Sequence, residues 1–165
     1  MRYFVAFSYF GKSYHGWQRQ PNALSVQETM EKTFSTLLRT DIKLAGAGRT
    51  DAGVHAKQMY AHFDVPSAIT TTELVYKLNS FLPQDIAVHN VYHVGETAHA
   101  RFDAVERTYE YWVTQQKNPF LQEAAYFIGY PLDIDAMNRA AAELLQHTDF
   151  ECFSKSNTDV KTYQC

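Results

Sequence analysis

The chain has 165 residues, of which 45% are hydrophobic and 20% are charged, and this composition is typical of a globular protein and argues against a disordered one. The net charge of −3 argues mildly against a nucleic-acid partner. Cys152 and Cys165 have no spacing typical of a zinc site, and no stretch approaches the length of a membrane-spanning helix. We therefore expect a cytoplasmic protein with no membrane contact and no metal.

The charge is unevenly distributed along the chain. Residues 1–57 hold eight Lys or Arg against four Asp or Glu, whereas residues 58–165 hold seven against fourteen. The basic excess therefore lies in the N-terminal third, and a local basic surface is compatible with the acidic total.

The first half of the chain alternates between strand and helix patterns. Residues 2–10 are β-branched and aromatic, which predicts a strand. Ser25 and Glu28 form a capping box at the start of a helix that ends near Arg39, and Thr70 and Glu73 form a second one before a helix that Pro83 ends. Three further strands are predicted, at 42–49, 58–65 and 86–94.

This order, β-α-β-β-α-β, is that of the ferredoxin-like arrangement, so we predict an α+β fold with an antiparallel sheet and both helices on one face. Residues 1–94 would form this half, and residues 95–165 would be a second part of the chain. In that second part we predict strands or strand beginnings at 106–114, 150–153 and 161–165 and a helix over 133–146.

The stretch AGAGRTDAGVHA, residues 45–56, surrounds Arg49 and Asp51 with small residues. In an extended backbone these two side chains point the same way, near enough for an ion pair. Asp51 could then act as a nucleophile, a general base or a metal ligand, although no further carboxylates lie nearby in sequence to complete a metal site. The alternative interpretation is that Asp51 only caps a turn.

The segment GRTDAGVHA resembles the signature of the tRNA pseudouridine synthase A family. Four more segments resemble blocks of that family in the same order: YFGKSYHGWQRQP with SVQ, LNSFLPQDIAV, HARFDAVERTYEYW and HTDFECF. One departure is Phe10, which stands where the family usually has the aspartate of Tyr-Asp-Gly.

The resemblance implies a role for five residues. Asp51 falls on the family's catalytic nucleophile, and Arg49 would fill the space left by a flipped uridine or pair with Asp51. Tyr109 falls on the tyrosine that stacks on the uracil, although strand tyrosines are more often packing residues. His55 would contact a phosphate or satisfy backbone groups, and Arg101 would bind the RNA backbone or hold a loop.

Five residues in and near the first loop mix cations with aromatic rings, as RNA-binding loops do. The alternative is an ordinary solvated loop. These residues are Lys12, Arg19, Lys57, Tyr14 and Trp17.

The resemblance further implies isomerisation of uridine to pseudouridine at positions 38–40, in the anticodon stem-loop of tRNA, with no cofactor and no metal. The partners would be tRNA and, for the full-length chain, a second copy in a homodimer. The resemblance also implies that residues 1–94 are the ferredoxin-like half that carries the catalytic loop and that residues 95–165 begin a second, related half. Because family members are longer, we expect an N-terminal fragment that alone is not active, dimeric or tRNA-competent at normal levels.

Two other function classes stay open. A non-catalytic RNA-binding module could use the same sheet, although no RNP1-like pattern is present. A phosphotransferase with an aspartate nucleophile would need further acidic residues to hold magnesium.

Overall fold

The computed structural model describes residues 1–154, and the chain divides into two compact units, Met1–Tyr109 and Glu110–Cys165. The first unit continues past residue 94, because Arg2 and His62 form hydrogen bonds with the backbone of Ala98 and Ala100. The division into a catalytic half and a second, related half remains a prediction.

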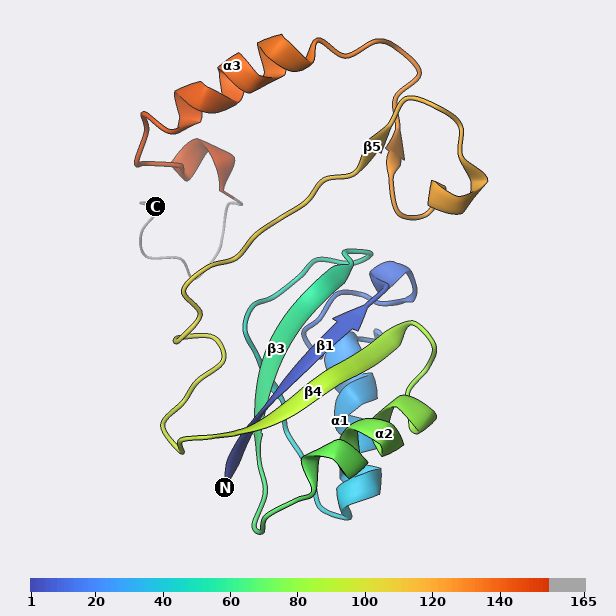
Figure 1. The fold of residues 1–165 in the computed structure, drawn as a ribbon, viewed down its shortest axis with the longest axis vertical. Helices are drawn as coiled ribbons and strands as arrows, with labels where there is room; N and C mark the ends of the chain where they lie inside the picture. The colour runs from blue at the N-terminus through green and yellow to red at the C-terminus, as the bar shows by residue number, and fades with distance from the viewer. Residues whose placement is uncertain (155–165) are drawn as a thin grey trace. The chain divides into compact units, whose positions relative to one another are not determined.

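The first unit contains an antiparallel sheet in the order β2-β3-β1-β4, with two helices on one face (Figure 1). This strand order confirms the predicted ferredoxin-like half and its α+β class. The elements are β1 (Arg2–Tyr9), α1 (Val26–Leu38), β2 (Ala45–Gly46), β3 (Ala56–Asp64), α2 (Thr71–Phe81) and β4 (Ile86–Val94).

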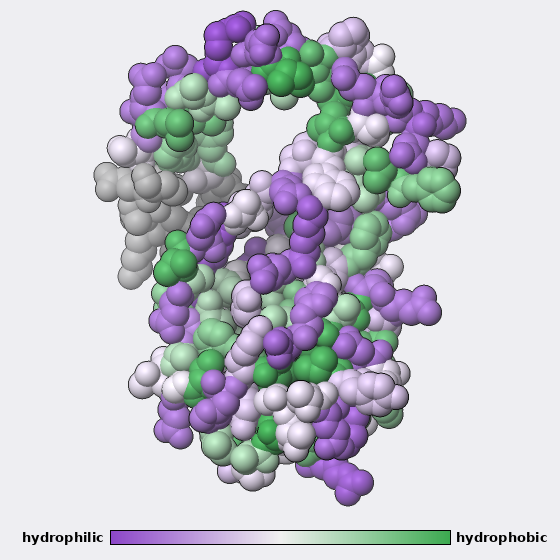
Figure 2. All heavy atoms as spheres, in the orientation of Figure 1, coloured by the Kyte–Doolittle hydropathy of each residue, from purple (hydrophilic) through white to green (hydrophobic). Residues whose placement is uncertain are grey.

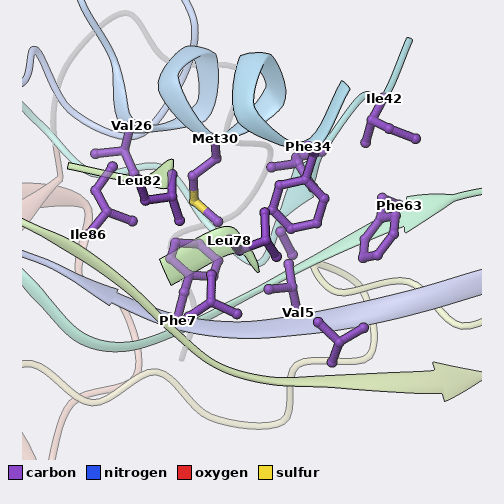
Figure 3. Close-up of a cluster of buried hydrophobic side chains, with 14 of the residues drawn as sticks. Val5, Phe7, Val26, Met30, Phe34, Ile42, Phe63, Leu78, Leu82 and Ile86 are labelled. Atoms are coloured by element: carbon purple, nitrogen blue, oxygen red, sulfur yellow. The ribbon is translucent and has the colours of Figure 1, made fainter. Parts of the chain in front are cut away.

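The hydrophobic core fills the space between this sheet and the two helices (Figure 3). Alternate residues of β1, among them Val5 and Phe7, are buried, as the period of two in a strand requires. Met30 and Phe34 of α1 meet them at helical spacing, and Leu78 of α2 completes the layer. Full burial of one such side chain stabilises the fold by about 1.5–3 kcal/mol.

The two predicted capping boxes have different outcomes. The Glu28 N–H donates to Ser25 Oγ at 3.2 Å, so Ser25 caps α1 as predicted. The Thr70 side chain makes no capping hydrogen bond, so that prediction is wrong, although α2 still begins directly after Thr70.

Strand β2 is much shorter than the predicted strand over 42–49. The backbone of Leu44 forms its hydrogen bonds with α1: its N–H donates to Glu31 Oε1 at 2.9 Å, and its carbonyl accepts from Gln27 Nε2 at 2.8 Å. The Ile42 N–H likewise donates to Ser35 Oγ at 2.9 Å. Because helix side chains satisfy these groups, only residues 45–46 join the strand ladder.

The second unit differs from its prediction. Of the strand predicted over 106–114, only Val113–Thr114 (β5) forms, in parallel pairing with Tyr126–Phe127 (β6). A strand needs a neighbouring strand that satisfies its backbone, and in the described part of the chain the strand pairing of this stretch covers Val113 and Thr114. The helix predicted over 133–146 forms as Ile134–Leu144 (α3).

The remaining elements are short. Residues 150–153 were expected to begin a strand but contain the 3-10 helix Glu151–Phe153, because local turns satisfy the backbone there: the Phe153 N–H donates to the Phe150 carbonyl at 3.0 Å. The predicted strand 161–165 lies outside the described residues. Two other 3-10 helices are Gly11–Ser13 and Pro119–Leu121.

Between residues 110 and 154 no side chain is buried. Figure 2 shows hydrophobic residues at the surface of this unit, among hydrophilic ones. No helix in the described residues is both long enough and apolar enough to span a membrane.

Candidate active site

Residues 47–55, here called the RTD loop, connect β2 to β3, and Thr50 anchors the middle of this loop. The Trp17 N–H donates to both oxygens of Thr50, at 3.1 Å to Oγ1 and 3.4 Å to the carbonyl. The Tyr9 hydroxyl lies 2.9 Å from Thr50 Oγ1. The centre of the loop is therefore attached both to the first loop and to the sheet.

Two glycines allow the first loop and the RTD loop to approach each other closely. Gly16 has φ +83°, and a Cβ at this position would lie 2.1 Å from the Thr50 carbonyl oxygen. Gly53 has φ +78°, and its N–H donates to the Tyr14 carbonyl at 3.1 Å. Both need the left-handed conformation that glycine adopts most readily.

Arg49 and Asp51, on either side of Thr50, have exposed side chains. No ion pair joins them in the part of the chain that the structure describes, so the predicted pairing is not formed. The two residues adjoin the fixed Thr50, and their charged groups face solvent, where a large substrate can reach them.

His55 contacts the backbone of the first loop. Its Nδ1 accepts a hydrogen bond from the Gly11 N–H at 2.9 Å, and its ring stacks on Phe10 with ring centres 3.9 Å apart. This geometry matches the backbone-satisfying alternative for His55. It also gives Phe10, the departure from the family pattern, a contact within the candidate site.

Arg101 and Tyr109 lie in the segment that follows β4. The Arg101 side chain is exposed, and its guanidinium carbon lies 5.9 Å from the centre of the Phe102 ring. The Tyr109 side chain is 79% exposed and lies outside any strand. Among the described residues, no hydrogen bond or ring contact joins Tyr109 to Asp51.

Two aromatic residues of the first loop are buried, although their composition suggested a surface role. Trp17 is 1% exposed and Tyr14 is also buried, so both belong to the core. The Tyr14 hydroxyl donates to Asp85 Oδ1 at 2.7 Å, and burial together with this contact raises the pKa of Tyr14. The Arg19 guanidinium lies 3.6 Å from the nearly buried Glu31 carboxylate. Lys12 and Lys57 are exposed.

Sequence reasoning assigned no role to two residues that contact this region. Nη2 of Arg107 donates to the carbonyls of Ala47 and Arg101, at 2.8 and 3.0 Å. His62 accepts the Ala100 N–H at 3.2 Å through Nδ1. Arg107 belongs to the same R-x-Y-x-Y segment as Tyr109, and this is the one sequence signal that points to it.

Within residues 1–154, no three His, Cys, Asp or Glu side chains gather into a group that could hold a metal ion. Asp51 accordingly stands in the loop as a single carboxylate. A single carboxylate can act as a nucleophile or as a base.

Comparison with known proteins gives a consistent result. Residues 5–103 match the sequence profile of the tRNA pseudouridine synthase family. The chain is 52% identical to tRNA pseudouridine synthase A of Bacteroides thetaiotaomicron over 99% of this chain and 61% of the relative. It is 51% identical to the protein of that name from Bacteroides fragilis (99% and 66%), and 38% identical to that from Staphylococcus aureus (98% and 62%).

The chain thus spans less than two thirds of the length of these curated relatives. The matched residues include the RTD loop, Arg101 and all of the ferredoxin-like sheet except the first three residues of β1. The chain belongs to the tRNA pseudouridine synthase family.

Proposed function

We propose that this protein, as a complete natural chain, isomerises uridine to pseudouridine in the anticodon stem-loop of tRNA, with Asp51 as the nucleophile. The observation that carries the proposal is the combination in one loop of a fixed backbone at Thr50 with an exposed carboxylate at Asp51. A positioned nucleophile that substrate can reach is what covalent catalysis requires.

The reaction rearranges one nucleotide without a co-reactant. The bond between N1 of uracil and C1′ of ribose breaks, the base turns, and a bond from C5 to C1′ forms. The hydrogen of C5 leaves as a proton, and N1 gains a proton, so the atoms balance. Asp51 would attack the nucleotide covalently or stabilise the ribosyl cation, and either step needs a uridine outside its base stack.

The other candidate residues have supporting roles. Tyr109, exposed and aromatic, would stack on the flipped uracil, since base–aromatic stacking stabilises extruded bases. Arg49 would fill the space that the uridine leaves, and Arg101 would contact the RNA backbone. His55 would hold the RTD loop against the first loop through its bond with the Gly11 N–H.

The family and the distribution of charge support the proposed substrate. The excess of basic residues in 1–57 lies in the same stretch as the RTD loop, which favours a polyanionic partner there. We propose tRNA as that partner, a homodimer for the complete protein, and a cytoplasmic location.

The test is to map pseudouridine in a tRNA transcript incubated with the protein, by carbodiimide labelling and primer extension. Stops at the uridines of the anticodon stem-loop, absent from a transcript with cytidines at those positions, are expected. RNA binding without any modified base would instead favour the non-catalytic binding module.

A further inference from the structure

Arg107 connects two parts of the first unit that are far apart in sequence. One hydrogen of Nη2 is donated to the Ala47 carbonyl at 2.8 Å, at the start of the RTD loop, and the other to the Arg101 carbonyl at 3.0 Å. The guanidinium also lies beside Gly48, where a Cβ would be 3.6 Å from Nε. We propose that Arg107 is a positioning residue that fixes the RTD loop, and with it Asp51, for the reaction.

The segment at the far end of this bridge is itself attached to the sheet. The Ala100 N–H donates to Nδ1 of His62 at 3.2 Å, and Ala100 is only 4% exposed. Nη1 of Arg2 donates to the Ala98 carbonyl at 3.0 Å. Arg107 therefore links the RTD loop to a segment held by β1 and β3.

The hydrogen bonds of Arg107 hold a part of the RTD loop that the other contacts of the loop do not hold. Thr50 fixes the middle of the loop, and Gly53 fixes the part after Asp51 through its bond to the Tyr14 carbonyl. The start of the loop, at Ala47 and Gly48, precedes both of these attachments. Without Arg107, the backbone of Ala47 and Gly48 would keep, among the hydrogen bonds of the described residues, the one from the Ala47 N–H to the Tyr60 carbonyl, at 2.8 Å.

The chemistry of the side chain explains why arginine suits this position. A guanidinium is planar and holds its N–H donors in a fixed arrangement, so one nitrogen can serve two carbonyls at once. Lysine has a compact ammonium on a flexible stem, and we expect it to restore only part of the bridge.

The first readout is hydrogen exchange of the amides in residues 46–54, compared among the unsubstituted protein, Arg107→Ala and Arg107→Lys. The loss of two hydrogen bonds should speed exchange there by about threefold to tenfold in Arg107→Ala, with an intermediate value for Arg107→Lys. Lys77→Ala removes another exposed cation, from α2, and should leave this exchange unchanged.

The second readout rests on the proposed function and uses the complete natural chain with tRNA. We expect kcat to fall by about the same factor in Arg107→Ala, with KM unchanged and with partial recovery in Arg107→Lys. Unchanged exchange in Arg107→Ala would overturn the proposal, as would a rise in KM alone, which would mark Arg107 as an RNA contact. If the unsubstituted protein makes no pseudouridine, the proposed function fails, and the exchange comparison still decides whether Arg107 fixes the loop.

Discussion

Thr50 contributes to the candidate site through its position between Arg49 and Asp51. Its hydroxyl is enclosed by the Tyr9 hydroxyl and the Trp17 N–H, while its two neighbours are exposed. A single threonine thus separates the groups that hold the loop from the groups that can meet a substrate. The small residues around it let the first loop come close enough to form these bonds.

The Tyr9 hydroxyl should contribute measurably to stability. Tyr9→Phe removes the bond to the Thr50 hydroxyl inside the protein, so we expect the free energy of unfolding in urea to fall by about 0.5–1.5 kcal/mol. Tyr60→Phe is the matched control, because its hydroxyl accepts a hydrogen bond from Gln58 in an exposed contact that should matter less. Equal losses in the two variants would contradict this assignment.

The two glycines with positive φ should respond differently to alanine. Gly53→Ala adds a Cβ that meets nothing within 4 Å, so it should cost only the strain of a left-handed residue, about 1–2 kcal/mol. Gly16→Ala adds the same strain and a clash with the Thr50 carbonyl oxygen, so it should cost clearly more. Urea unfolding of both variants checks this, and a smaller loss at Gly16 would mean that the loops separate easily.

At the residue scale, a motif with a single interpretation was a good guide to the structure. A loop composition that fits both an exposed and a packed loop was misleading. The ion pair predicted for Arg49 and Asp51 did not form, because it depended on side-chain positions that spacing does not determine. Tyr14 and Trp17 stood in a polar loop, yet that loop folds back and buries them. Arg107 was missed because its partners are backbone carbonyls, which sequence does not reveal.

At the element scale, α1 supports β2 through its side chains. Gln27 and Glu31 bind the carbonyl and the N–H of Leu44 as a neighbouring strand would. This explains the main error in the predicted strand lengths, since residues 42–44 have the strand pattern without a strand partner. The order of the elements was predictable because hydrophobic periodicity survives in sequence, whereas these tertiary hydrogen bonds do not.

Glu31 should therefore matter more than Glu28, although both lie near the Arg19 guanidinium. Glu31 is 5% exposed, and Glu31→Leu leaves the buried Leu44 N–H without its acceptor, so we expect a loss of about 1–3 kcal/mol in the free energy of unfolding. Glu28→Leu removes an exposed pair and should cost less than about 1 kcal/mol. A loss at Glu28 as large as that at Glu31 would argue against the buried network.

The contact between β3 and the segment after β4 should depend on pH. Burial lowers the pKa of His62; Arg2 and His99 lower it further, while Asp64 and Asp103 act in the opposite direction. Because the unfolded state then binds the proton more readily, this contribution to stability is complete above about pH 6.5 and is lost as the pH falls below it. Protonation also removes the acceptor for the Ala100 N–H.

His62→Asn tests this effect, since the amide oxygen can accept the same N–H without titrating. The unfolding free energy, measured at about pH 7.5 and about pH 5, should fall more steeply with acid in the unsubstituted protein than in the variant. If the unfolding free energy of both proteins fell equally between the two pH values, His62 would not be the source of the pH dependence.

At the scale of the whole molecule, burial is confined to the first unit. All the buried side chains of the described residues lie between Tyr3 and Ala100, and none lies between 110 and 154. Sequence reasoning predicted the ferredoxin-like half well because its periodic patterns meet partners within residues 1–94. It predicted strands over 106–114 and 150–153 poorly, because a strand pattern forms a strand only where a neighbouring strand satisfies its backbone.

Residues 1–109 expressed alone should therefore fold. We expect a cooperative unfolding transition for this piece and no such transition for residues 110–165, which have no buried side chain in their described part. Circular dichroism and tryptophan fluorescence during urea unfolding would detect the transition of residues 1–109, since Trp17 is buried there. A cooperative transition in residues 110–165 would contradict this division.

The most direct test of the central claim is tritium release from a tRNA transcript that carries 5-tritiated uridine. The complete natural chain is compared with Asp51→Ala and with Asp41→Ala, which removes another exposed carboxylate outside the RTD loop. Formation of the C5 bond must expel the C5 hydrogen, so release reports the isomerisation itself. We predict release by the unsubstituted protein and by Asp41→Ala, and none by Asp51→Ala. Release by a folded Asp51→Ala variant at the unsubstituted rate would show that this carboxylate is not the nucleophile.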